Sequence, residues 1–331
     1  MKNKFAPFLF CLVPLLFLPA RAADLRIGMI GLDTSHVTAF LQTLNEPQHK
    51  DHVAGARIVA GYKGGSPDIE SSSSRVDGFT KTAVEKYGVK MYDTIEELAQ
   101  NVDAVIVLSV DGRTHLDQFR RTLAAKKPVY IDKMLAGSLK DGVEVARLAR
   151  ESKVPVFCAS SLRYSPDSPA GKLDKIGQIT SVYSFGPAEL EPHHPDMFWY
   201  GIHAVEALYA VMGPGCVKVS RTHATNTDVL TGVWKDGRVG IMQGNRSGGK
   251  GFGGYGVRVF GTKGGVTGGE KHSYKPLVEE FVKFFQTGIT PVPLETTVEV
   301  LAYMEAADES KRRGGAPVSI AEVMKAAGAK P

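Results

Sequence analysis

The chain has 331 residues, of which 43% are hydrophobic and 23% are charged. This composition excludes a mainly disordered chain, and the length leaves room for two domains of ordinary size. The net charge is +5, but the first 22 residues hold three cations and no acid, and the remainder carries 37 cations against 35 anions. Because no Lys/Arg run interleaved with aromatic residues is present, we expect no nucleic-acid partner.

The first 22 residues are predicted to be a signal peptide. Residues 1–4 are cationic, residues 5–19 are apolar, and Ala20 and Ala22 form an A-x-A cleavage pattern. An uncleaved anchor is the alternative, but the apolar stretch contains prolines and is shorter than the roughly 20 residues of a membrane span. We therefore expect Sec-type export to the periplasm or the exterior, a mature chain that begins at Ala23, and no stable membrane span after cleavage.

Two cysteines, Cys158 and Cys216, remain after cleavage of the leader. An oxidising compartment permits a disulfide between them, and two separate buried thiols are the alternative. The sequence leaves both possibilities open.

From residue 25 onward, short apolar runs alternate with helical periodicity, which predicts a Rossmann-type α/β domain with a mostly parallel sheet. Strands are expected over residues 25–30, 57–60, 102–110, 128–131 and 155–159. A helix follows Gly31, because Val37, Phe40, Leu41 and Leu44 share one face. Ser138 is the expected N-cap of a later helix that continues to Arg150.

Around residues 163–169 prolines and serines replace this alternation, and we place the domain boundary there, with residues 23–163 before it and 164–331 after it. Strands are expected over residues 178–185, 217–224, 237–243 and 256–260, followed by helices over 276–286 and 295–312. This order predicts an α+β domain with an open, mostly antiparallel sheet. Loops are expected at residues 71–74 and through the glycine-dense residues 244–269.

The first strand, glycine turn and helix form the scaffold on which dinucleotides bind, with the pyrophosphate at the helix N-terminus. Where G-x-G-x-x-G is expected, the sequence reads Gly31, Leu32, Asp33, Thr34, Ser35 and His36, so only the first glycine is present. Asp33 places a carboxylate where a phosphate should approach. Its alternative role is to cap the helix with Thr34.

At the end of the next strand, where an acid normally accepts the ribose hydroxyls of NAD, no acid is found. Lys63 stands there instead. It is a candidate contact for the 2′-phosphate of NADP, and a solvated lysine is the alternative.

Asp132, Lys133 and Met134 follow the strand over residues 128–131, and here the chain resembles the glucose-fructose oxidoreductase and inositol dehydrogenase family (Gfo/Idh/MocA), whose members carry an E/D-K-P motif. The resemblance spans almost the whole mature chain, and it is carried by residues 109–115, 126–133, 163–166, 201–206 and 257–265 and by Phe281, Gly288 and Ser310.

The resemblance implies a two-domain oxidoreductase that holds NAD or NADP on its first domain and a carbohydrate or polyol in the cleft. It also implies that Lys133 hydrogen-bonds the substrate oxygen and that His203 is the acid/base at the oxidised carbinol. The cofactor is expected against residues 31–36, Lys63, Ser109, His115, Asp132 and Lys133. An exported member must hold its cofactor tightly, and by resemblance a homo-oligomer is expected.

The sequence departs from the family pattern at three places. The glycine loop is altered, Met134 replaces the motif proline, and Trp199 stands where an aspartate usually precedes the catalytic histidine. His193, His194 and Asp196 are candidate substitutes for this acid. A redox-inactive carbohydrate-binding or accessory protein is therefore the alternative function.

We predict no metal site. The histidines near residue 193, with His36, His203 and Asp33, are a conceivable ligand set, but no H-E-x-x-H or paired C-x-x-C motif accompanies them.

Overall fold

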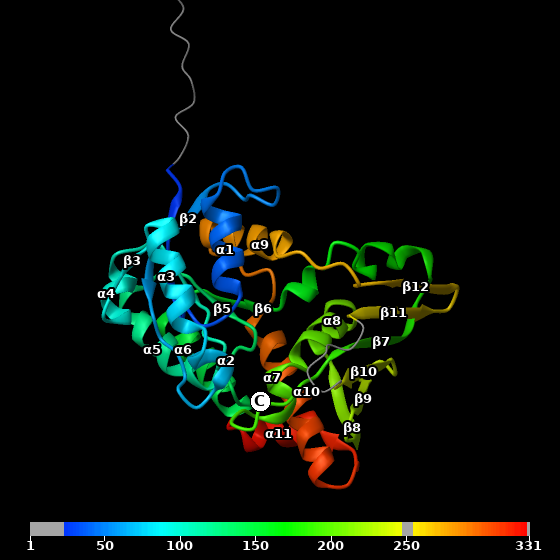
Figure 1. Cartoon of the computed structure of the whole chain (residues 1–331). Coiled ribbons are helices and arrows are strands. Elements are labelled where there is room, and N and C mark those ends of the chain that lie inside the picture. Colours follow the sequence, from blue (N-terminus) through cyan, green and yellow to red (C-terminus); the bar gives the residue numbers. More distant parts are fainter. Residues whose placement is uncertain (1–22, 247–253, 330–331) are drawn as a thin grey trace, which may run out of the picture.

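A computed structural model describes residues 23–246 and 254–329. It contains two sheets that lie side by side, with helices on and between them (Figure 1). The predicted fold class, a Rossmann-type parallel sheet followed by a mostly antiparallel one, is confirmed. The expected signal peptide lies outside the described residues.

The first sheet is entirely parallel, in the strand order β3-β2-β1-β4-β5-β6. Its strands are β1 (Leu25–Ile30), β2 (Ala56–Tyr62), β3 (Lys90–Met91), β4 (Ala104–Val107), β5 (Val129–Asp132) and β6 (Val156–Ala159). The helices of this half are α1 (His36–Asn45), α2 (Glu70–Ser73), α3 (Val76–Tyr87), α4 (Ile95–Gln100), α5 (His115–Thr122) and α6 (Leu139–Ser152). The strand order reverses between β1 and β4, the point at which doubly wound sheets bind ligands.

Local sequence signals explain where several of these elements begin. The expected N-cap of α6 is confirmed, since the Ser138 hydroxyl accepts the Asp141 N–H at 3.1 Å. Residues Val37, Phe40, Leu41 and Leu44 of α1 are buried against β1, as their spacing predicts.

The second sheet has the order β12-β11-β7-β10-β9-β8-β13, in which β7 and β10 are parallel and all other neighbours are antiparallel. Its strands are β7 (Ile179–Pro187), β8 (Cys216–Ala224), β9 (Thr227–Trp234), β10 (Val239–Asn245), β11 (Gly256–Gly261), β12 (Gly264–Gly268) and β13 (Val318–Ser319). The helices are α7 (Asp196–Trp199), α8 (Ile202–Met212), α9 (Lys275–Thr287), α10 (Leu294–Arg312) and α11 (Ile320–Ala326).

Helices α8 and α10 lie between the two sheets (Figure 1). Both are buried along nearly their whole length. Because α8 is apolar on every side, it has no amphipathic stripe, and the periodicity of the sequence did not predict it.

Helix α9 comes from the second half of the chain but packs on the first sheet. The Phe281 ring lies 5.4 Å from that of Phe40 in α1 and 5.1 Å from that of Tyr130 in β5, measured between centroids. Phe284 contacts Phe157 of β6 in the same way, at 5.7 Å. The core of the first sheet is therefore completed by residues that follow it by more than a hundred positions.

Two expectations about loops and cysteines are resolved here. Residues 71–73, expected as a loop, belong to helix α2, and the glycine-dense region contains β11 and β12, with residues 247–253 outside the described residues. Cys158 and Cys216 are separate buried thiols.

In residues 23–246 and 254–329, no helix combines the length and apolar character that a membrane crossing requires.

Candidate functional site

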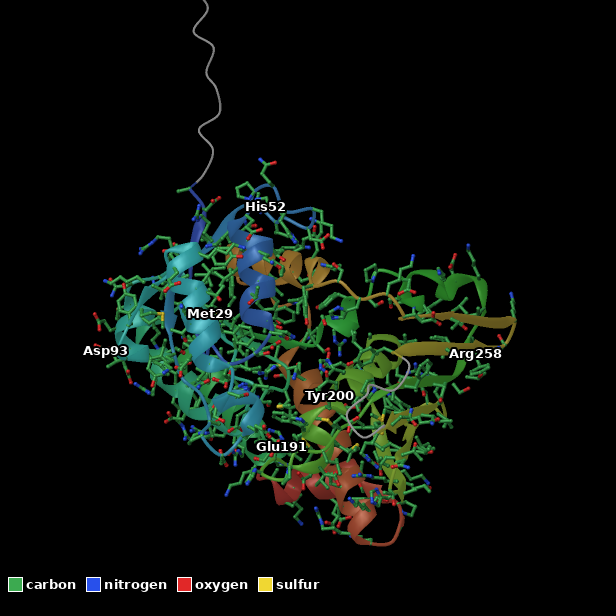
Figure 2. The ribbon with its side chains drawn as sticks, viewed as in Figure 1. Met29, His52, Asp93, Glu191, Tyr200 and Arg258 are labelled. Carbon is green, nitrogen blue, oxygen red and sulfur yellow. The ribbon has the colours of Figure 1, made fainter. Side chains whose placement is uncertain are left out.

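A cavity of about 420 Å³ lies between the two halves of the chain. Tyr200, labelled in Figure 2 near the middle of the molecule, is one of its walls. The lining comes from the start of α1, the end of β5, the segment around α2, and the α7–α8 region; it comprises Thr34, Ser35, His36, Ser71, Arg75, Val110, Lys133, Ser161, Leu162, Glu189, Trp199, Tyr200, His203, Tyr255, His272 and Tyr274.

The turn after β1 brings the start of α1 to this cavity. Gly31 has φ +84°, and a Cβ at this position would lie 2.1 Å from the Ser109 hydroxyl oxygen, so only glycine fits. Ser35 at the start of α1 is exposed, and Thr34 and His36 beside it line the cavity. The N-terminal end of α1, the positive end of its dipole, therefore faces the cavity, with the N–H groups of His36 and Val37 bonded to Thr34.

The Asp33 carboxylate is fully buried and does not face the cavity. One oxygen accepts the Val110 N–H at 2.9 Å, and the other accepts the Ser72 hydroxyl at 2.6 Å. The side chain therefore crosses from the end of β1 to the loop after β4. It ties these two loops together, a role that neither the phosphate-contact nor the capping interpretation of the sequence anticipated.

Residues 63–75, which we call the strap, connect β2 to α3 across the same edge of the sheet. The Ser66 hydroxyl donates to Asp111 at 2.6 Å, and Arg113 pairs with Asp68 at 2.9 Å, so the strap is fastened to the loop after β4. Ser72, the partner of Asp33, is part of it. A Cβ on Gly64 would lie 3.1 Å from the Gly31 Cα, which shows how closely the strap covers the first turn.

The two ends of a dinucleotide site differ in this structure. The crevice between the ends of β1 and β4, where the Rossmann fold receives the adenosine and pyrophosphate, is covered by the strap and crossed by Asp33. The end that faces the second sheet is open, because the cavity and the start of α1 lie there. The open cavity is therefore at the end of the site nearer the second sheet, and the strap lies over the other end.

His36 and Asp132 form a buried pair at the edge of the cavity. The His36 Nδ1 lies 2.6 Å from an Asp132 carboxylate oxygen, and the other oxygen accepts the Tyr130 hydroxyl at 3.0 Å. Burial opposes ionisation of Asp132, but the neighbouring His36 and Lys133 outweigh it and hold the pKa of this carboxyl below its usual value. The carboxylate thus fixes the orientation of the His36 ring.

Lys133 follows Asp132 and projects to the cavity wall. The peptide bond between Lys133 and Met134 is cis. Burial lowers the pKa of Lys133 against the opposing effect of Asp132, and the charge of Arg75 lowers it further. Within the described residues its ammonium has no carboxylate partner within ion-pair distance, so it is available to an oxygen atom in the cavity.

His203, at the start of α8, faces the cavity from the second half of the chain. Its Nδ1 lies 2.8 Å from the Ser160 hydroxyl oxygen, which follows β6. Burial first, and then the positive charge of Lys133, lower the pKa of His203 well below the usual value. Ser160 therefore occupies the orienting position for which the sequence offers no aspartate, and His203 is neutral near pH 7.

Aromatic rings form much of the remaining wall. Tyr200 and Tyr255 each approach the His203 ring edge-on, with centroids 5.2 and 5.9 Å away. Tyr274 approaches His36 and His272 at 4.8 and 4.6 Å. Such walls suit the C–H faces of a sugar ring, with the imidazoles and Lys133 available to its hydroxyls.

The structure brings together only some of the residues that the sequence predicts for this site. Thr34, Ser35, His36, Lys133 and His203 line one cavity. Leu32, Asp33, Ser109, His115 and Asp132 are buried behind it, and Gly31 is covered by the strap.

Two of these predicted residues have other partners. His115 lies with its two ring nitrogens 2.8 Å from the carbonyl oxygens of Ser109 and Met134, so it connects two loops. Lys63 is on the surface and pairs with Asp77 at 2.6 Å.

The three residues considered as substitutes for the missing aspartate are turned away from the cavity. Asp196 bonds Arg221 and Lys311, His193 pairs with Glu191, and the buried His194 ring lies 5.2 Å from the ring of Trp199 at an interplanar angle of 55°. Sequence reasoning missed Arg75, Ser160, Tyr255, His272 and Tyr274, because no spacing rule links these positions to the motif residues.

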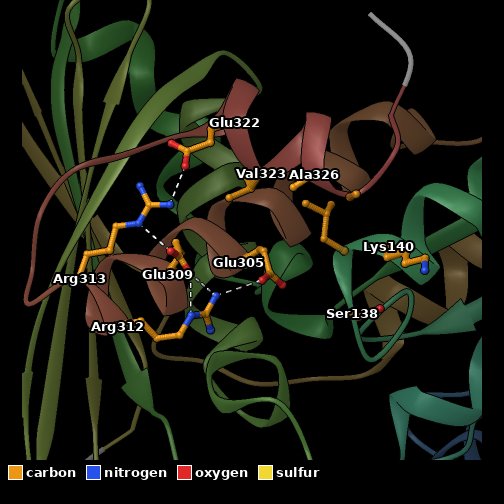
Figure 3. A pocket seen from close by; sticks show the side chains of 11 residues that line it. Ser138, Lys140, Glu305, Glu309, Arg312, Arg313, Glu322, Val323 and Ala326 are labelled. Atoms are coloured by element: carbon orange, nitrogen blue, oxygen red, sulfur yellow. Dashed lines mark hydrogen bonds and ion pairs between the residues drawn. The ribbon is translucent and has the colours of Figure 1, made fainter.

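Another hollow, of about 520 Å³, lies between α10, α11 and the start of α6 (Figure 3). Its arginines are paired with its glutamates: Arg313 with Glu309 and Glu322 at 2.6 Å, and Arg312 with Glu309 at 2.5 Å. These paired charges satisfy one another on an open surface, so the hollow is a weaker candidate site than the cavity between the two halves.

The absence of a metal site stays a prediction. Among the described residues, no three His, Cys, Asp or Glu side chains are grouped as metal ligands.

Comparison with known proteins gives a family match for part of the chain and a fold for most of it. Residues 25–160 match the oxidoreductase family with an NAD-binding Rossmann fold. A probable dehydrogenase from Thermotoga maritima has a similar structure, with a TM-score of 0.70 and 22% identity over 90% of this chain and 100% of that one. No curated protein matches the sequence.

Two further structures were solved with ligands. One is scyllo-inositol dehydrogenase from Lactobacillus casei with NAD(H) and scyllo-inositol (TM-score 0.70, 16% identity, 90% of this chain and 100% of that one). The other is an oxidoreductase from Agrobacterium radiobacter in complex with NAD+, L-tartaric acid and magnesium (TM-score 0.72, 16% identity, 91% and 100%). At these identities the likeness concerns the fold.

We predict that Ser72→Ala loosens the strap. The change leaves one oxygen of the buried Asp33 without its donor, which costs about 1–3 kcal/mol locally. In hydrogen–deuterium exchange followed by mass spectrometry, the amides of residues 66–75 should exchange at least about tenfold faster than in the unmodified protein.

Ser73→Ala is the control, because the Ser73 hydroxyl bonds only carbonyls of its own helical turn. Equal exchange in the two variants would show that the Asp33–Ser72 bond does not hold the strap.

Proposed function

We propose that this chain, which belongs through residues 25–160 to the Gfo/Idh/MocA oxidoreductase family, is an exported enzyme that transfers hydride between a tightly held NAD(P) and a hydroxyl of a carbohydrate or polyol. The observation that supports this most is the cavity in which Lys133, His203 and the start of α1 meet. Its aromatic walls and hydrogen-bonding side chains suit a polyhydroxylated ring. The scyllo-inositol found in the Lactobacillus casei structure is an example of such a ring.

Different residues of the cavity contribute to different steps of alcohol oxidation. His203, neutral and oriented by Ser160, takes the hydroxyl proton of the substrate. The Lys133 ammonium stabilises the negative charge that develops on the same oxygen. When bound, the nicotinamide accepts the hydride from the carbinol carbon.

Thr34, Ser35 and Val110 line the open end of the cavity and would hold the nicotinamide half of the cofactor. The pyrophosphate would rest at the start of α1. Because the strap covers the adenosine half, binding requires its bonds to Asp33, Asp111 and Arg113 to open. Tight retention follows if the strap then closes over the bound cofactor, which suits an enzyme working where free NAD is scarce.

Binding and turnover test the proposed function. We expect the mature chain to release a nicotinamide dinucleotide on denaturation, or to bind NAD or NADP in calorimetric titration, and to change absorbance at 340 nm with inositols or hexoses. Absence of binding to both cofactors at millimolar concentration would contradict the proposal and favour a carbohydrate-binding accessory protein.

We predict a specific pH response from Lys133. Loss of this ammonium in Lys133→Met lowers kcat about 10²–10³-fold, because the developing oxyanion loses its partner. It also raises the pKa of His203 toward the usual 6.5, since a nearby positive charge no longer opposes protonation. His203 then becomes protonated at higher pH, so the acidic limb of kcat/KM moves upward.

Lys140→Met, which changes an exposed lysine at the start of α6, is the control and should match the unmodified protein in rate and profile. If the acidic limb of kcat/KM does not move in Lys133→Met, the charge of Lys133 does not lower the pKa of His203.

Export is tested at the N-terminus. Expression of the full chain in a Gram-negative host should give periplasmic protein whose first residue is Ala23, as read by mass spectrometry. Replacing Ala20 and Ala22 with bulky residues should leave the leader attached. Cytoplasmic protein that retains Met1 would contradict this part of the proposal.

A further inference from the structure

Three imidazoles line the cavity: His272 lies with its Nε2 3.1 Å from the Ser161 hydroxyl oxygen, and the other two have different partners. His203 is oriented by a hydroxyl, that of Ser160, and His36 by a carboxylate, that of Asp132. Alcohol oxidation as proposed above uses only the first. The second therefore forms an acid/base pair without an assigned role.

The partner decides which nitrogen of each ring carries the proton. A hydroxyl can donate or accept, so Ser160 orients His203 without fixing its tautomer. An ionised carboxylate only accepts, and therefore Asp132 requires the proton of neutral His36 on Nδ1. The lone pair of His36 is then on Nε2.

The Nε2 edge of His36 is the edge that faces the cavity. Its Nδ1 edge is turned to the buried Asp132, which does not line the cavity, whereas His36 does. Within the described residues no hydrogen bond is formed to Nε2. A basic nitrogen held by a buried carboxylate and free on its other side is the arrangement of a general base.

We propose that His36, oriented by Asp132, is a second general base that removes a proton from the carbon next to the carbonyl of a keto sugar or inosose. This inference rests on the proposed function for the origin of the ketone. It extends that function from hydride transfer to proton transfer at carbon.

The step balances without a further oxidant or reductant. The C–H bond α to the carbonyl breaks, and its proton passes to Nε2 of His36. The electron pair forms the C=C bond of an enolate, and the carbonyl π pair moves to oxygen, beside the Lys133 ammonium. Return of a proton from His36 restores the ketone and completes an exchange.

The groups that surround His36 are suited to proton transfer from a carbon atom. Tyr274 packs on the His36 ring at 4.8 Å, and its own pKa is raised to about 12 by burial, so it stays neutral. Lys133 is the chain neighbour of Asp132 and lies in the same wall. The base and the group that stabilises the enolate oxygen are thus carried by adjacent structural elements.

Deuterium exchange measures the step independently of turnover. The probes are the inosose derived from scyllo-inositol and 3-keto-glucose, each incubated with the full mature protein in D₂O, with and without NAD. Proton NMR follows the loss of the α-proton signals, and thermal melting checks that each variant is folded. We expect the protein to accelerate exchange of at least one probe at least 100-fold over buffer.

His36→Gln should lower the exchange rate measured without NAD about 10²–10⁴-fold. Asp132→Asn, which keeps the shape but no longer requires the proton on Nδ1, provides a second variant and should lower exchange at least 100-fold. His223→Gln is the matched control: His223 lies 2.7 Å from Asp228 in another His–Asp pair, outside the cavity, and its loss should leave exchange unchanged.

The outcomes separate this inference from the proposed function. Ketone reduction without exchange of either probe overturns the role of His36 and leaves the dehydrogenase intact. Exchange that depends on His36, without any reduction, supports the second base and contradicts the proposed function. Exchange that persists in a folded His36→Gln variant also overturns the inference.

Discussion

The Asp132 carboxylate is the group on which the arrangement of the cavity depends. A buried charge must be paired and hydrogen-bonded, and Asp132 meets this requirement with the His36 ring and the Tyr130 hydroxyl. Because His36 begins α1 and Asp132 ends β5, the pair joins the first turn of the fold to the motif strand. The position of Lys133, the next residue, follows from that connection.

A second buried carboxylate, Asp33, explains the altered glycine loop. An aspartate at this position conflicts with a bound phosphate, but here it holds the loop after β4 and the strap. The fold therefore retains the Rossmann strand order while the strap and Asp33 are bonded across the edge of the sheet at β1 and β4. Cofactor binding in such a protein includes the cost of opening these contacts.

The sequence predicted the fold class and most strands correctly, because apolar runs depend on local pattern, and residues 25–160 match the family that the motif order resembles. It did not predict α8, whose burial on all sides leaves no periodicity, or the helix at residues 71–73. Lys133 and His203 were found by resemblance. Ser160 and Tyr274 were not, since their place beside the two histidines arises from tertiary packing that no spacing encodes.

The packing of α9 on the first sheet affects the order in which the chain can fold. While the chain is being synthesised, the aromatic face of β5 and β6 stays without its cover until residues 275–287 emerge. We therefore expect the first half of the chain to be less stable by itself than its continuous sequence would indicate. A fragment that ends near residue 163 would expose Phe40, Tyr130 and Phe157 to solvent and self-association.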